Sequence, residues 1–166
     1  MYLSTSTHHS NQGYYSGAKK SIFLAGPTAR NAYSGTKWRW DARQYLNDRD
    51  EIVLFVPEPT DLSDGYCDDL TKWWPKFEDQ VDWELHHLQI ADVIMFWIPR
   101  EFPDYPGLTT NVEFGAWYRD SKTVYGRPNW SVKNEYLDRI WSIDRSTPVI
   151  SDLEILCECA LQILGQ

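Results

Sequence analysis

A short apolar run at residues 93–98 (VIMFWI) constrains the fold of this chain more than any other segment. It is rich in β-branched and aromatic residues, and Pro99 ends it. Such a run is typical of a strand buried on both faces of a parallel sheet.

The rest of the chain alternates between short apolar segments and amphipathic ones. Further strands are expected at residues 21–25, 52–56, 122–126 and 139–141. Helices are expected at residues 37–47, 77–90 and 151–164, and from the Thr109-Thr110 pair onward, with Ser151 capping the last helix. The pattern predicts a single-domain α/β fold: a flavodoxin- or Rossmann-like parallel sheet of about five strands, with helices on both faces. Residues 1–20 are polar and without period, so we expect a flexible arm before a domain at 21–166.

Composition limits the class of protein. The chain has 166 residues, enough for one domain, and a net charge of −8 without a basic run. This argues against nucleic acid or a membrane as partner, although a local Arg cluster could hold one phosphate. Three Cys residues form neither a disulfide framework nor a zinc spacing, and no signal-peptide pattern is visible, so we expect a reduced, cytoplasmic protein.

Glu113 is the first candidate for a chemical role. It is expected on the first turn of the helix after the central strand, where ligands bind in open α/β sheets. Thr110 and Glu113 also have the spacing of a capping box, so a purely structural role stays open. The helix N-terminus would favour the carboxylate by roughly 0.3–1 kcal/mol, which suits a nucleophile that is ionised at neutral pH.

Glu84 is the second candidate, because a carboxylate on an apolar helix stripe needs a partner or a cavity. The expected stripe of helix 77–90 consists of Phe77, Val81, Leu85 and Leu88, with Glu84 on it. Glu84 either pairs with a buried Arg or enters the same crevice as Glu113. His86 and His87 are expected at the surface.

Two loops could complete a site. The turn at residues 26–30 (GPTAR) brings backbone amides and one Arg to the sheet edge; it could hold a hydroxyl or phosphate, or be a plain turn. The acidic, aromatic segment 61–74 is expected to be a long surface loop, and loops of this length are often functional. Two acids in one crevice with aromatic walls suggest chemistry at a glycosidic bond.

Three segments carry a resemblance to a known family: IFLAGP at 22–27, WELHHLQIADVIMFWIP at 83–99 and GLTTNVEFGAW at 107–117. Together they resemble the nucleoside 2-deoxyribosyltransferase family, in its deoxyribosyltransferase-like branch, over roughly residues 21–141. The resemblance implies that Glu113 is the nucleophile, and that Glu84 is the substrate-binding acid. Glu84, Asp82 or water would protonate the leaving base. No cofactor is implied.

The chain also departs from well-known members. Phe23 replaces a Tyr that touches the nucleophile, and Gly107 replaces an Asp that binds the sugar 5′-hydroxyl, for which Asp104 is a candidate substitute. A neighbouring subunit supplies an Asn in the family, and Asn129 or Asn134 could serve here. The substrate-binding candidates are Gly26, Pro27, Thr28, Arg30, Arg39, Trp97, Pro99, Asp104, Thr109, Thr110 and Asn129.

The implied activity is exchange of the nucleobase of a (deoxy)ribonucleoside, with retention, through a covalent glycosyl-glutamate. The expected partners are nucleosides, free nucleobases and further copies of the chain in a homo-oligomer. One alternative is a nucleoside 5′-monophosphate N-glycosidase, with phosphate held by Thr28, Arg30, Arg39 and Thr110. The other is a non-catalytic nucleotide-binding module.

Overall fold

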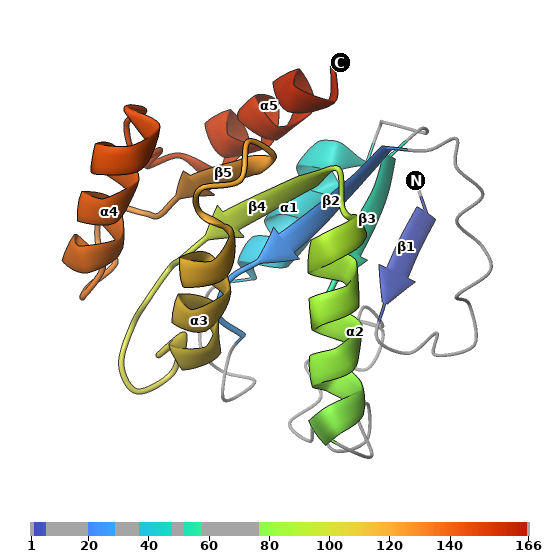
Figure 1. The fold of residues 1–166 in the computed structure, drawn as a ribbon, viewed down its shortest axis with the longest axis horizontal. Coiled ribbons are helices and arrows are strands. Elements are labelled where there is room, and N and C mark those ends of the chain that lie inside the picture. The colour runs from blue at the N-terminus through green and yellow to red at the C-terminus, as the bar shows by residue number, and fades with distance from the viewer. Residues whose placement is uncertain (1, 6–19, 29–36, 48–51, 58–76, 166) are drawn as a thin grey trace.

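The computed structural model describes residues 2–5, 20–28, 37–47, 52–57 and 77–165. Five parallel strands form one sheet in the order β1-β3-β2-β4-β5 (Figure 1). They are β1 Tyr2–Thr5, β2 Lys20–Ala25, β3 Ile52–Val56, β4 Val93–Trp97 and β5 Thr123–Gly126. The predicted flavodoxin-like α/β fold is confirmed.

The central strand β4 is buried along its whole length, as its sequence predicts. Its side chains alternate between two cores, which is the period of a strand covered on both faces. Val93, Met95 and Trp97 join one apolar cluster, whereas Ile94 and Phe96 join the other.

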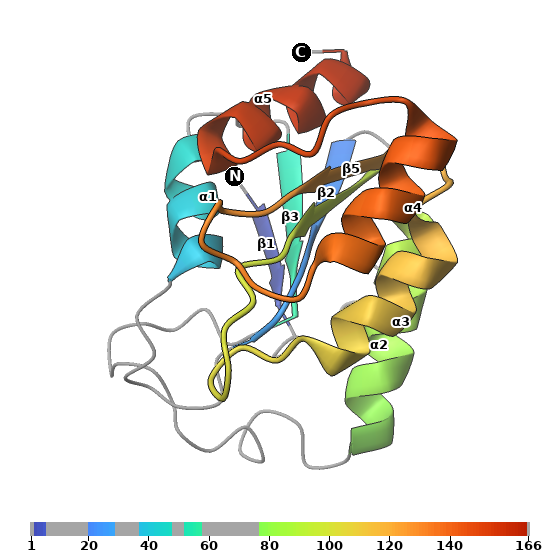
Figure 2. The same cartoon turned by 90° about the vertical axis from the view of Figure 1, so that its left-hand side faces the viewer.

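In the described part of the chain, five helices cover the two faces of the sheet (Figure 2). The first cluster contains residues of α1 (Trp38–Leu46) and α5 (Leu153–Leu164), so these two helices cover one face. The second contains residues of α2 (Phe77–Ile90), α3 (Leu108–Trp117) and α4 (Glu135–Arg145), which cover the other.

Three predictions about individual elements are wrong. Residues 139–141 lie inside α4 and not in a strand, because Leu137 and Trp141, four residues apart, bury one helix face. Residues 2–5, expected in a flexible arm, pair with β3 as β1. The N-cap of α5 is Asp152 rather than Ser151: its carboxylate accepts the amides of Glu154 and Ile155 at 2.9 and 3.0 Å. The predicted loop 61–74 lies outside the described residues, and the boundary at residue 20 stays a prediction.

The buried face of α2 also differs from the predicted stripe. Leu85 is 56% exposed, whereas Trp83, His87 and Leu88 are buried. The His87 ring stacks on Trp83 at 4.1 Å and meets Phe55 edge-on, so an aromatic contact with β3 sets the rotation of the helix. Placing His87 at the surface is therefore wrong.

Lys122 fixes the C-terminal end of α2. Its Nζ donates to the carbonyl oxygens of Leu88, Gln89 and Ala91 at 2.9, 2.9 and 3.0 Å. A cation at this end satisfies carbonyls that the helix leaves free and interacts favourably with the helix dipole. This contact anchors the helix that carries Glu84.

Burial of His87 predicts loss of stability in acid. Burial lowers the pKa of His87 from 6.5 to about 4, so the folded state favours the neutral ring and stability falls as pH drops from 6.5 toward 4. Between neutral pH and pH 4.5, we expect the free energy of unfolding to fall by about 1–2 kcal/mol less in His87→Phe than in wild type. Urea unfolding at the two pH values measures this difference. His86→Gln, at an exposed neighbour, is the control; equal acid losses in wild type and His87→Phe would contradict this prediction.

Candidate active site

The strand order places a crevice between β2 and β4. The chain leaves β2 for β3 on one side and then crosses back to β4 on the other, so the order reverses between these neighbouring strands. In open α/β sheets, ligands bind beyond the carboxyl ends of the strands at such a point. The turn after β2 and the start of α3 lie at this edge.

Gly26 and two residues of α1 shape the turn after β2. A Cβ on Gly26 would lie 2.1 Å from the carbonyl oxygen of Trp97, so only glycine lets β2 and β4 end this close together. Trp38 Nε1 and Arg39 Nη1 both donate to the Pro27 carbonyl, at 3.1 and 3.3 Å. The first residues of α1 therefore fix the turn after β2 through hydrogen bonds to its backbone.

Glu113 is not part of a capping box. Helix α3 begins at Leu108, with Gly107 as its N-cap in the left-handed conformation (φ 60°) and without a side-chain cap hydrogen bond. Thr110 is thus inside the helix, and Glu113 is on the second turn rather than the first. The predicted helix start at Thr109-Thr110 is wrong because Gly107, in the left-handed conformation, is the N-cap instead. Glu113 therefore does not have the capping role that the sequence suggested.

The carboxyl groups of Glu113 and Glu84 interact with each other and with Arg39. Burial raises the pKa of Glu113 from 4.5 to about 8, the negative charge of Glu84 raises it further, and Arg39 opposes both. Burial likewise raises the pKa of Glu84, against a 2.9 Å hydrogen bond from Gln80 Nε2 and the charge of Arg39. The structure thus brings together an acid from α2, an acid from α3 and an arginine from α1.

The charge state of Glu113 differs from the expected one. A helix N-terminus contributes roughly 0.3–1 kcal/mol in favour of a carboxylate. A pKa of about 8 corresponds to roughly several kcal/mol against it, because each pKa unit is worth about 1.4 kcal/mol. Burial and the charge of Glu84 therefore outweigh the helix and raise the pKa of Glu113 well above its ordinary value.

The other predicted residues lie in different surroundings. Thr109 and Asp82 are exposed, Thr110 is buried, Asp104 is half-buried and Asn129 is exposed. Trp97 packs into the apolar cluster with Trp38, and Pro99 is buried after it. Asn134, which could have served a neighbouring subunit, is buried in its own chain, where its Nδ2 donates to Ser131 Oγ at 2.5 Å. Arg30 lies outside the described residues.

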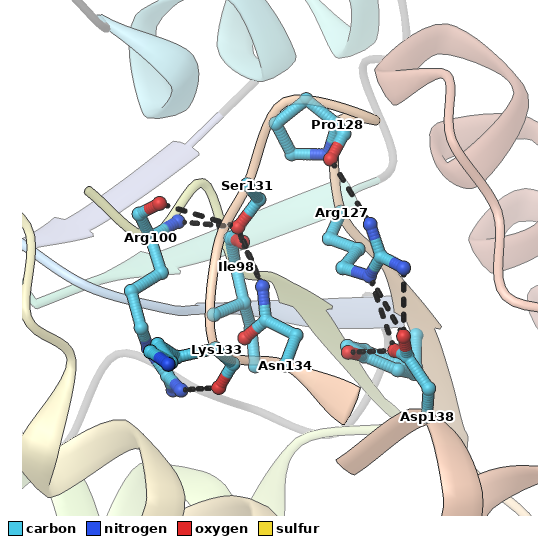
Figure 3. Close-up of polar contacts among 9 residues, drawn as sticks. Ile98, Arg100, Arg127, Pro128, Ser131, Lys133, Asn134 and Asp138 are labelled. Atoms are coloured by element: carbon cyan, nitrogen blue, oxygen red, sulfur yellow. Dashed lines mark hydrogen bonds and ion pairs between the residues drawn. The ribbon is translucent and has the colours of Figure 1, made fainter. Parts of the chain in front are cut away.

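Sequence reasoning missed Arg100, which follows the central strand directly after Pro99. Arg100 is 4% exposed, and its side chain donates to the Lys133 carbonyl at 2.5 Å (Figure 3). The guanidinium also donates to Asn111 Oδ1 at 2.5 Å. Within the described part of the chain, Arg100 Nε has no hydrogen-bond partner and no carboxylate is bonded to the guanidinium. A Cβ on Gly107 would lie 3.7 Å from Nε and Nη2, so the guanidinium lies against the N-cap of α3. An Arg at the carboxyl end of a buried strand is the signal that could have identified it.

The segment after β5 is fixed across the end of β4. Ser131 Oγ donates to the Ile98 carbonyl at 2.7 Å, and the Arg100 amide donates to Ser131 Oγ at 2.7 Å (Figure 3). Arg127 forms an ion pair with Asp138 at 2.7 Å, which joins the end of β5 to α4. These contacts fix the backbone of Arg100 relative to the segment after β5.

Comparison with known proteins decides the family. The family described as "Nucleoside 2-deoxyribosyltransferase like" matches residues 19–129, a span that includes both acids, Arg39 and Arg100. The chain belongs to this family. The match confirms the resemblance seen in the sequence and supports a role as a nucleoside-modifying enzyme. No curated protein matches the chain.

The part of the chain that the structure describes shows neither a candidate metal site nor a candidate membrane-spanning helix. No group of three or more His, Cys, Asp or Glu side chains there could hold a metal ion. Among the same residues, none of the helices has the length and apolar character that crossing a bilayer requires.

The raised pKa of Glu113 predicts a stability cost at alkaline pH. The folded state favours the protonated acid, so stability falls as pH rises from 4.5 through about 8. We expect Glu113→Gln, which carries no titrating proton, to be more stable than wild type at pH 8 by about 1–3 kcal/mol, and the gain to vanish near pH 4.5. Denaturant unfolding at both pH values, with the exposed Glu101→Gln as control, measures it. A gain of the same size at both pH values would refute this cause.

Proposed function

We propose that this protein is a nucleoside 2′-deoxyribosyltransferase, which exchanges the nucleobase of a (deoxy)ribonucleoside with retention at C1′. The observation that carries the proposal is the half-buried pair of Glu84 and Glu113 at the switch point of the sheet, in a chain of this family. A pair of carboxyl groups with raised pKa values supplies both a nucleophile and an acid in one cavity.

The pair titrates as a unit. The reaction requires the negative charge on Glu113 and a proton on Glu84, and burial raises the pKa of both carboxyl groups. A carboxylate oxygen of Glu113 attacks C1′ as the bond from C1′ to the base nitrogen breaks. The electron pair of that bond leaves with the base, which takes the proton from Glu84. The product of this half-reaction is a glycosyl ester on Glu113.

The second half-reaction reverses the first. A nitrogen of the incoming base attacks C1′, the ester bond breaks and its electron pair returns to Glu113. Glu84 accepts the proton that the incoming base loses. Two inversions give net retention. Glu84 is a better placed acid than Asp82, because Asp82 is exposed and Glu84 acts electrostatically on Glu113.

Base exchange tests the proposal directly. We expect purified protein, given a deoxynucleoside and a different free base, to form the second deoxynucleoside, detected by liquid chromatography. Glu113→Gln keeps size and polarity but cannot form the ester, so transfer should fall by about a thousandfold or more. Glu78→Gln, at an exposed acid on α2, is the matched control. A folded Glu113→Gln protein that exchanges bases at the wild-type rate would refute the mechanism; binding without any base release would favour a nucleotide-binding module.

A second candidate, hydrolysis of nucleoside 5′-monophosphates, is favoured by Arg100. Its buried guanidinium lies against Gly107, at the position where the family's well-known members have an Asp for the 5′-hydroxyl. The first turn of α3 carries no acid, and a helix N-terminus beside a cation attracts a phosphate. Arg39 is less suited to that role, because its donors bind the turn after β2.

Substrate comparison separates the two candidates. If Arg100 recognises a 5′-phosphate, Arg100→Met should lower kcat/KM for a deoxynucleoside 5′-monophosphate by about tenfold or more and change that for the deoxynucleoside little. Product analysis with and without acceptor base distinguishes transfer from hydrolysis. Equal losses on both substrates would show that Arg100 only supports the fold, and Arg127→Met, at the ion pair with Asp138, is the control for such a loss.

A further inference from the structure

We propose that Arg39 is a positioning residue, which holds the turn after β2 in place and sets a positive charge near Glu84 and Glu113. This inference rests on the proposed function for its catalytic meaning. It concerns a residue whose donors bind the turn after β2 and whose charge acts on the two acids.

The geometry of Arg39 is that of a clamp. Its side chain is 1% exposed, and its donors reach successive acceptors of one short segment. Nε donates to the Leu24 carbonyl at 3.0 Å, Nη2 to the Gly26 carbonyl at 2.6 Å, and Nη1 to Thr28 Oγ1 at 3.2 Å. With the bond to Pro27, one guanidinium binds the end of β2 and the whole following turn.

This arrangement requires an arginine. A guanidinium presents five N–H donors in a rigid plane, whereas a lysine ammonium has three donors around a single point. Lys at position 39 could keep the charge but could not reach the acceptors on both sides of the turn. The two roles of Arg39 can therefore be separated by substitution.

Trp38 forms a second hydrogen bond to the same turn, from an uncharged side chain. Its Nε1 shares the Pro27 carbonyl with Arg39, and its ring lies 4.3 Å from the Arg39 guanidinium carbon. Trp38→Phe removes the hydrogen bond but keeps an aromatic ring under the guanidinium. It is the matched variant that loosens the turn and leaves the charge in place.

The charge of Arg39 acts on both acids. From α1 it lowers the pKa of Glu113 on α3 and the pKa of Glu84 on α2. Among the described residues, Glu113 also experiences the charge of Glu84, and Glu84 accepts a hydrogen bond from Gln80. Removing the arginine should therefore make Glu113 harder to ionise, as well as loosening the turn.

A titration that needs no substrate tests this role. The protein is labelled with carboxyl-13C glutamate, and its NMR signals are followed from pH 4 to 10, with Glu113→Gln and Glu84→Gln to assign the pair. We expect Arg39→Met to raise the titration midpoint of the Glu113 signal by about one pH unit or more. Trp38→Phe and Arg39→Lys should leave it within about half a unit of wild type, although both lower the melting temperature.

The outcomes separate the inference from the proposed function. An unmoved midpoint in Arg39→Met, or an equal rise in Trp38→Phe, would show that Arg39 is only structural. If Arg39→Met does not fold, Arg39→Lys decides, because it keeps the positive charge. A rise of about one pH unit in the Glu113 midpoint of Arg39→Lys would overturn the charge role. Absence of base exchange in wild type would refute the proposed transferase while leaving this titration intact.

Discussion

The candidate site depends on keeping two half-buried carboxyl groups, those of Glu84 and Glu113, near the buried guanidinium of Arg39. Burial opposes the charge of Glu113 strongly enough to raise its pKa to about 8, and Glu84 adds to this effect. Such a group destabilises the fold at neutral and alkaline pH, which is a common property of functional sites. Arg39 offsets part of the cost because its charge favours ionisation of both acids.

Glu84, Glu113 and Arg39 are each positioned by contacts that fix the helix or turn to which they belong or bind. Lys122 anchors the end of α2, and thus Glu84, through three helix carbonyls. Phe114, next to Glu113, is fully buried against Phe96 of the central strand, with ring centroids 5.2 Å apart. The close approach of Gly26 to Trp97 brings the turn that Arg39 holds to the same edge. The central strand and its neighbours therefore position a polar site by apolar packing.

Much of this fold could be predicted from the sequence, because strands buried on both faces give short, continuous apolar runs such as residues 93–98. Elements whose identity depends on tertiary contact could not. Only Leu137 and Trp141 of helix α4 are buried, and β1 is too short to show a period. His87 looked like a surface residue because polarity alone does not reveal an aromatic stack. At the candidate site, the positions of Glu84 and Glu113 on α2 and α3 could be predicted from the sequence, whereas their raised pKa values depend on burial. Arg100 has no motif spacing, and only its place at the end of a buried strand could have identified it.

The central claim is that Glu113 forms a covalent bond to the sugar. Its most direct test is mass spectrometry of protein incubated with a 2′-fluorinated nucleoside, in which fluorine slows turnover of the glycosyl ester by destabilising the oxocarbenium-like transition state. The mechanism predicts a mass increase of one fluorinated sugar, located on the peptide that contains Glu113, and its loss when an acceptor base is added. Base release without any adduct, or an adduct on a peptide other than that of Glu113, would contradict it.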